Sequence, residues 1–136
     1  MFAVSRAARQ FETLAARALG ADDLTFLEGL TLAALFFESP RPVQPSQLAE
    51  TFATTRGNVS HCISSLEARG LLQRRIDPAD ARVYQLALRP QGRRTALRVI
   101  AEFDKLQKIF ENEIGKAPLG AMLKALRELE ACALNR

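Results

Sequence analysis

The spacing of apolar residues predicts a mainly α-helical chain with one short β-hairpin. Near the N-terminus, apolar residues three and four positions apart mark one face of a helix: Phe11, Leu14, Ala15 and Ala18. Residues 25–37 are largely apolar on all sides, which is typical of a helix buried in a core. Thr25 and Glu28 have the spacing of a capping box at the start of that helix. Pro40 and Pro42 then predict a loop.

Residues 45–52 and 56–68 predict two short helices separated by a tight turn. Pro45 suits the first position of a helix, Thr55 is a good N-cap for the second helix, and Gly70 follows where a C-cap would sit. The apolar residues of the second helix are expected to pack inward: Val59, Cys62, Ile63 and Leu66. Its remaining surface is polar and carries small side chains, which suits entry into a major groove about 12 Å wide. An ordinary solvated amphipathic helix is the alternative.

Residues 72–88 predict a β-hairpin, because apolar and polar side chains alternate on both sides of a turn-rich tip. Arg82 lies in the tip, and Arg74 and Arg75 lie at its base. A guanidinium on a protruding loop can enter a minor groove, where the negative potential is strong. The alternative is a solvated hairpin in which Arg82 only pairs with Asp80. Pairing with Asp80 and binding in the minor groove are compatible, since the ion pair could hold the tip in the shape that presents Arg82.

The excess of positive charge is confined to one part of the chain. The 136 residues carry a net charge of +4. Residues 41–94 contain nine basic and four acidic residues, a net charge of +5, and the remainder has ten basic and eleven acidic residues, a net charge of −1. A surface that binds DNA phosphates needs this asymmetry, because displaced counterions supply much of the affinity. An acidic protein or a membrane surface would also attract a basic segment.

Short motifs across the central two-thirds of the chain match a known pattern. They are Leu24-Thr25, Gln47-Leu48-Ala49, Val59-Ser60, Leu66-Glu67-Ala68-Arg69-Gly70-Leu71-Leu72, Arg75, Asp77-Pro78-Ala79-Asp80-Ala81-Arg82, and Leu88 with Gly92. A Leu-Glu-x-x-Gly-Leu helix end followed by Asp-Pro-x-Asp-x-Arg is a fairly specific combination. On these residues the chain resembles the MarR (multiple antibiotic resistance regulator) family.

The resemblance implies a dimeric DNA-binding regulator, often a repressor that a small ligand or an oxidant relieves. Within a single MarR-like domain of residues 1–136, it implies a winged helix-turn-helix lobe at 24–92. Helices at 1–22 and 93–136 would form a helical dimerisation domain. In the family, the helix aligned with 56–68 reads the major groove and the arginine aligned with Arg82 reads the minor groove. The expected DNA-binding residues are Thr55, Arg56, Asn58, Ser60, His61, Ser64, Arg74, Arg75 and Arg82.

The chain departs from the family pattern at three places. Ala81 stands where many members carry a second arginine, so the tip has one strong basic side chain. Arg89-Pro90 replaces the threonine that usually caps the following helix, so that Pro90 alone must mark its start. Glu28 replaces a common glutamine but still completes the capping box with Thr25.

The C-terminal region predicts helices that need a partner. A long apolar stripe follows Gly92: Leu97, Ile100, Phe103, Leu106, Phe110 and Ile114. After a break at 115–118, a second stripe follows: Leu119, Met122, Leu123, Leu126, Leu129 and Ala133. So long a striped helix cannot bury its face in one small domain, so we expect a homodimer on an inverted-repeat, palindromic operator in double-stranded DNA. The alternative is that the helix folds back on the N-terminal helix.

Other chemistry is sparse. There is no Gly-rich phosphate loop, no Ser-His-Asp set and no C-x-x-C spacing, so we expect no enzyme, no cofactor and no metal site. Cys62 is expected to be a core residue, with redox sensing as the alternative. Cys132 could meet its symmetry mate in a dimer, but the cytosol would keep it reduced.

The family architecture implies a ligand cleft between the dimerisation helices and the DNA-reading lobe. We expect a small, largely apolar or anionic ligand there, and Arg6, Arg9 and Arg17 motivate the anion, although a solvated face is the alternative. The apolar run at 25–37 is too short to span a bilayer, so we expect no membrane partner. Arg6 and Arg9 stand where a secretory signal would have its apolar core, so we expect a cytoplasmic location. The alternative function is a winged-helix module that binds a protein partner. The sequence does not identify the operator, the controlled genes or the effector. It also does not distinguish repression from activation.

Overall fold

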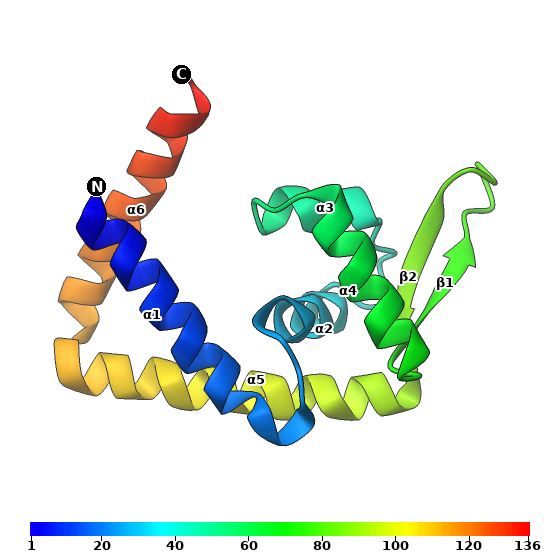
Figure 1. The fold of residues 1–136 in the computed structure, drawn as a ribbon, viewed down its shortest axis with the longest axis horizontal. Helices are drawn as coiled ribbons and strands as arrows, with labels where there is room; N and C mark the ends of the chain where they lie inside the picture. Colours follow the sequence, from blue (N-terminus) through cyan, green and yellow to red (C-terminus); the bar gives the residue numbers. More distant parts are fainter. The chain divides into compact units, whose positions relative to one another are not determined.

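The computed structural model describes residues 1–136 and is mainly helical, with one two-stranded antiparallel hairpin (Figure 1). The fold class expected from the sequence is therefore confirmed. Residues 1–102 and 103–136 form two compact units, and the boundary between them falls within the long helix α5. The elements are α1 (Phe2–Ala18), the 3-10 helix η1 (Gly20–Asp22), α2 (Phe26–Glu38), α3 (Pro45–Thr51), α4 (Arg56–Ala68), β1 (Leu72–Ile76), β2 (Tyr84–Leu88), α5 (Pro90–Ile114) and α6 (Lys116–Leu134).

Helix α2 forms the centre of the first unit, because it packs against α1, α4 and β2. The capping box is confirmed: the Glu28 amide donates to Thr25 Oγ1 at 3.2 Å, and the Thr25 amide donates to the Glu28 carboxylate at 2.9 Å. The expectation of burial on all sides holds for the middle of the helix, where Leu32 is fully buried. It is wrong at the C-terminal end, since Phe37 is 68% exposed.

Helices α3 and α4 begin where the sequence predicts. Pro45 opens α3, and the Thr55 hydroxyl accepts a hydrogen bond from the Asn58 amide at 3.1 Å, which caps α4. After α4, Gly70 adopts the left-handed φ of 71° that commonly ends a helix. The inward face of α4 is also confirmed, because four side chains are buried: Val59, Cys62, Ile63 and Leu66.

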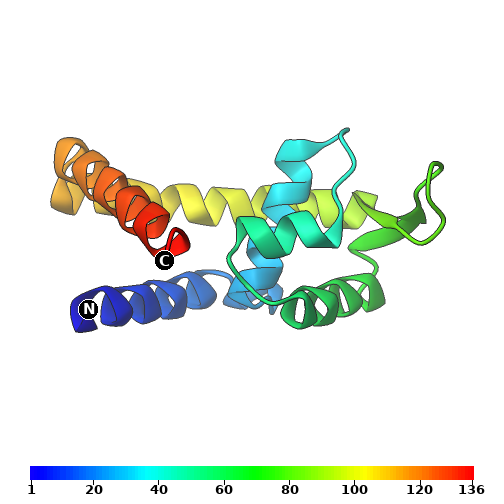
Figure 2. The ribbon, with the colours of Figure 1, turned by 90° about the horizontal axis from the view of Figure 1, so that it is seen from above.

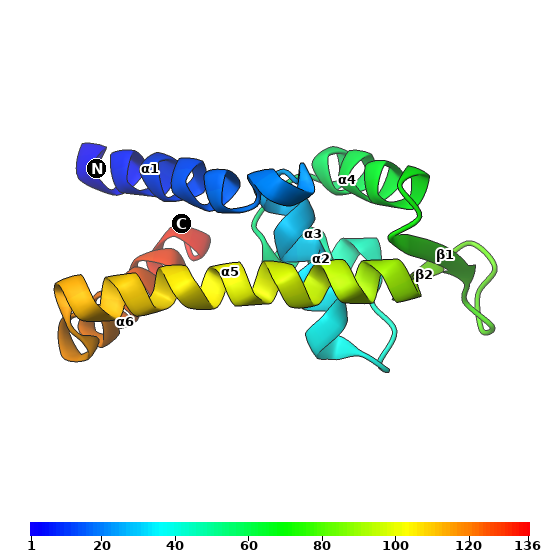
Figure 3. The ribbon, with the colours of Figure 1, turned by 90° about the horizontal axis from the view of Figure 1, so that it is seen from below.

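The hairpin has the predicted strands, and its register pairs Leu72 with Leu88 and Ile76 with Tyr84. The outer edge of β2 is partly covered, because the Leu86 amide donates to the carbonyl oxygen of Val43 at 2.8 Å. The loop that carries Val43 and helix α4 lie on opposite sides of α3 (Figures 2 and 3).

The second unit contains the end of α5 and all of α6. Helix α5 ends at Ile114 and α6 begins at Lys116, so the predicted break is confirmed only at Gly115, which has a φ of 97°. Residues 116–118, which were predicted to belong to the break, form the first turn of α6, where Pro118 is tolerated. Apolar side chains on one face of α6 are 40–49% exposed: Met122, Leu123, Leu126 and Leu129. No helix in the protein is both long enough and apolar enough to cross a membrane.

Candidate nucleic-acid interface

The solvent-facing surface of α4 carries the polar residues singled out from the sequence. Their side chains are exposed, while the apolar residues between them face the core: Arg56, Asn58, Ser60, His61 and Ser64. Thr55 contributes as the N-cap, and Asn58 Nδ2 donates to Thr54 Oγ1 at 3.1 Å. The start of α4 is therefore held by side-chain hydrogen bonds, which orient the polar surface.

A hollow of about 440 Å³ separates α4 from the wing, which is the β1–β2 hairpin with its tip at residues 77–83. Arg56 and Ser60 line it from α4, Arg82 and Tyr84 from the wing, and Pro45 from the start of α3. Because elements far apart in sequence meet here, the fold brings three of the expected DNA-binding residues to one surface: Arg56, Ser60 and Arg82.

The wing tip is held by its own aspartates. Asp77 Oδ1 accepts from the Ala79 amide at 2.8 Å, and Asp77 Oδ2 accepts from Gln85 Nε2 at 2.9 Å. Asp80 Oδ1 accepts from the Arg82 amide at 3.0 Å and from Arg82 Nε at 3.2 Å. These hydrogen bonds, first from the side chain and then from the backbone of Arg82, lower the pKa of Asp80 below its usual value. The predicted Asp80–Arg82 pair is thus confirmed, and the Arg82 side chain is still 91% exposed.

Arg74 attaches the wing to α4. Its guanidinium donates to Ser64 Oγ at 3.0 Å and pairs with the Glu67 carboxylate at 3.2 Å. It also lies 5.3 Å from the centre of the Tyr84 ring, a cation–π distance. Arg74 and Ser64 were expected to bind DNA. In this structure the two side chains contact each other, and Arg74 connects the wing to α4.

Arg75 is not brought together with the other expected residues. It follows Arg74 along β1, and successive side chains of a strand point to opposite faces. Arg74 faces α4, so Arg75 lies on the face of the hairpin that is turned away from α4.

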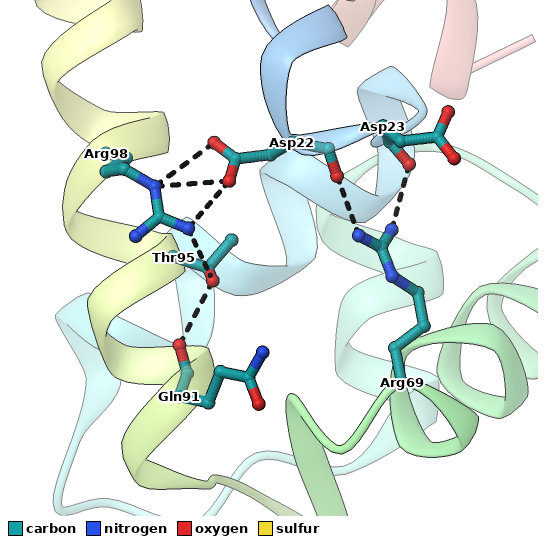
Figure 4. A network of polar contacts seen from close by, with 6 residues as sticks. All are labelled: Asp22, Asp23, Arg69, Gln91, Thr95 and Arg98. Carbon is teal, nitrogen blue, oxygen red and sulfur yellow. Dashed lines mark hydrogen bonds and ion pairs between the residues drawn. The ribbon is translucent and has the colours of Figure 1, made fainter.

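A polar network fixes the other end of α4 to its neighbours (Figure 4). Arg69, the C-cap residue of α4, donates to the carbonyl oxygens of Asp22 at 2.7 Å and of Asp23 at 2.8 Å. The Asp22 carboxylate pairs with Arg98 of α5 at 2.6 Å, and Arg98 also donates to Thr95 Oγ1 at 3.2 Å. These bonds connect α4, the turn after α1 and α5. Sequence reasoning missed them, although Arg69 belongs to the motif at 66–72.

The two cysteines lie in different surroundings. Cys62 is buried and hydrogen-bonded to Thr31 Oγ1 at 3.5 Å. Burial raises the pKa of the Cys62 thiol above its usual value, which disfavours the reactive thiolate. Cys132 is exposed and free. No group of three His, Cys, Asp or Glu side chains is arranged to hold a metal ion.

The fold and the surface formed by α4 and the wing define a winged helix-turn-helix protein. Residues 22–83, which are 62 of the 136 residues, match the model of the MarR family. This match confirms, for residues 22–83, the resemblance to the MarR family that was drawn from the sequence.

Solved structures of MarR-like regulators share the whole fold. MepR of Staphylococcus aureus in a complex with DNA is 19% identical, with a TM-score of 0.88 and 96% of each chain covered. The transcriptional regulator BldR from Sulfolobus solfataricus is 22% identical, with a TM-score of 0.83, and the match covers 96% of this chain and 91% of BldR. At these identities the likeness concerns the fold. No curated protein matches the sequence.

Proposed function

We propose that this protein is a sequence-specific DNA-binding transcriptional regulator, and a repressor in the first instance, which binds an inverted-repeat operator as a homodimer. The observation that carries the proposal is the surface shared by α4 and the wing. There an exposed polar helix face and the exposed Arg82 border one hollow. A helix of this kind reads base edges in the major groove, and an arginine on a wing suits the minor groove. The similar fold of MepR has been solved bound to DNA.

The proposed homodimer rests on the exposed apolar residues of the helices at 1–22 and 93–136. Besides the row on α6, Phe11 and Leu14 of α1 and Leu97 and Ile114 of α5 are at least 40% exposed. A second copy of the chain would remove this apolar surface from water, and paired helix-turn-helix readers match two half-sites.

We further propose that a small, largely apolar or anionic ligand releases the operator by favouring one spacing of the two α4 helices.

The experiment that tests DNA binding is a salt titration with random duplex DNA. A dimer that presents Arg56 and Arg82 twice should give a slope of log affinity against log salt of about −4, at about 0.9 per phosphate contact. A winged-helix module that binds a protein instead would show no such slope. Tight binding that is independent of salt, or no binding at low salt, would reject the proposal.

The two parts of the surface should contribute differently to operator binding. Ser60→Ala and His61→Ala should change which bases are selected from a random duplex library, because base-edge contacts carry the sequence information. Arg82→Ala should instead weaken binding by roughly tenfold, within the about 1–3 kcal/mol typical of such an arginine, and Arg82→Lys should lose less. Unchanged affinity of Arg82→Ala with a folded wing would make the hairpin purely structural.

A further inference from the structure

A second hollow, the hollow behind the wing, lies on the face of the hairpin that is turned away from α4 and has a volume of about 500 Å³. Arg75 and Gln85 pair across the two strands and line it from the hairpin. The loop at 39–42 and the start of α5 provide the other walls. That loop and α4 lie on opposite sides of α3, so this hollow is separate from the surface proposed to read DNA (Figures 2 and 3).

Positive charge without acidic partners gathers around the hollow behind the wing. Four arginines line it, and no lining residue is acidic: Arg41, Arg75, Arg89 and Arg93. Arg41 is paired with the neighbouring Glu38 at 2.9 Å, whereas Arg75, Arg89 and Arg93 are exposed and make no ion pair. Three guanidinium groups are therefore available to another molecule. A protein that docks here has to be acidic, because like charges that face each other across an interface cost several kcal/mol.

Apolar groups accompany these arginines. Leu35 and Leu86 contribute atoms to the lining of the hollow. The Arg93 guanidinium lies 4.7 Å from the centre of the Phe36 ring, and the Phe36 and Phe37 rings meet edge to face with their centres 5.8 Å apart. Phe37 is 68% exposed, so an aromatic ring extends the arginine surface outward from the end of α2. Arginine and aromatic side chains are the residues enriched at protein–protein interfaces.

We infer that the hollow behind the wing and the exposed Phe37 form a docking surface for an acidic segment of another protein, in which Asp and Glu flank apolar side chains. Arginine clusters recognise acidic peptide motifs, and each guanidinium can donate two parallel hydrogen bonds to a carboxylate. The apolar groups favour a protein segment over a second DNA duplex, because the outer surface of a duplex is a row of charged phosphates. The inference goes beyond the proposed DNA binding and does not depend on it.

Fluorescence anisotropy with the full chain tests this inference at low salt, where charges are screened least. The probe is a fluorescein-labelled peptide of sequence Glu-Asp-Leu-Glu-Glu-Phe-Asp-Glu. One control peptide has Gln and Asn in place of Glu and Asp, and the other has Ser in place of Leu and Phe. We expect the probe to bind and the neutral peptide not to bind. The serine peptide should bind several-fold more weakly than the probe, because it buries less apolar surface.

Two double variants that lose the same charge locate the binding site of the peptide. Arg89→Gln, Arg93→Gln alters the hollow behind the wing and should weaken binding of the probe at least about tenfold, as expected for hydrogen bonds to a charged group. Arg56→Gln, Arg82→Gln alters the hollow between α4 and the wing and should bind the probe like the wild type. If the first variant melts below the wild type, Arg75→Gln replaces it and should weaken binding several-fold, because this exposed side chain extends from the hairpin.

The inference is wrong if the probe does not bind, or if either control peptide binds as tightly as the probe. It is also wrong if Arg89→Gln, Arg93→Gln binds the probe like the wild type, or if both double variants weaken binding equally, since the peptide would then respond only to net charge. Displacement of the probe from the Arg56→Gln, Arg82→Gln variant by a random DNA duplex would assign the arginines behind the wing to DNA phosphates. That result would likewise overturn the inference.

Discussion

Gly92→Ala should strongly lower the thermal stability of the protein. Gly92 lies in the first turn of α5 and is buried against the backbone of Leu71. A Cβ atom at Gly92 would lie 1.7 Å from the Leu71 carbonyl oxygen, so the backbone would have to move. That oxygen also accepts from the Arg89 amide at 3.0 Å, and the shift would break this bond at the junction of wing and helix. We expect a loss of about 3 kcal/mol or more, and a midpoint lower by about 10 °C.

Gly20→Ala is the matched control. A Cβ atom at Gly20 meets nothing within 4 Å, and the residue lies at the surface of the first unit. Its midpoint should stay within about 2 °C of the wild type, as for most surface substitutions. Both variants are compared at equal protomer concentration, since assembly shifts the midpoint. A Gly92→Ala midpoint as high as that of Gly20→Ala would refute the close approach of α5 to Leu71.

Local signals were sufficient to predict most of the secondary structure. Pro45 and Thr55 mark helix starts through backbone geometry and capping, which depend on only a few neighbouring residues. The strand bounds follow from alternation around an Asp-Pro tip. Phe37 shows the limit of this reasoning, because an apolar residue at the end of a buried helix does not have to face the core.

The contacts that position the site could not be predicted in the same way. Arg69 and the carbonyl oxygens of Asp22 and Asp23 are 47 and 46 residues apart, and Arg98 is 76 residues from Asp22. Pairs so far apart leave no periodic pattern in one sequence. The same holds for Arg74, whose charge suggests DNA but whose partners are on α4.

The surface on which the positive charge lies also could not be predicted from the sequence alone. The sequence places the excess charge between residues 41 and 94, but a sum over a segment cannot tell one face from another. In the folded chain Arg56 and Arg82 line the hollow between α4 and the wing, while four other arginines line the hollow behind the wing. Of the nine expected DNA-binding residues, Arg74 contacts Ser64 and Glu67 of α4, and Arg75 lines the hollow behind the wing.

The double variant Leu123→Asp, Leu126→Asp should be monomeric and should nearly lose operator binding. Both leucines belong to the exposed row on α6, at 48% and 40% exposure. Two carboxylates there would have to be buried, without partners, in the proposed dimer interface, which is strongly unfavourable. A monomer reads one half-site, so the gain of about 10²–10⁴ in affinity from linked binding is lost. Sedimentation velocity and operator titration measure the two effects.

Lys124→Asp is the control for charge in this experiment. It changes the net charge by the same two units, but at 100° per residue it lies on the opposite face of α6 from the apolar row. It should remain dimeric and bind the operator within a few-fold of the wild type. Circular dichroism should show wild-type helix content in both variants, so that loss of the dimer is not loss of α6. If the leucine variant stayed dimeric, the row on α6 would not be the interface. If it became monomeric yet bound the operator fully, the operator would need only one half-site.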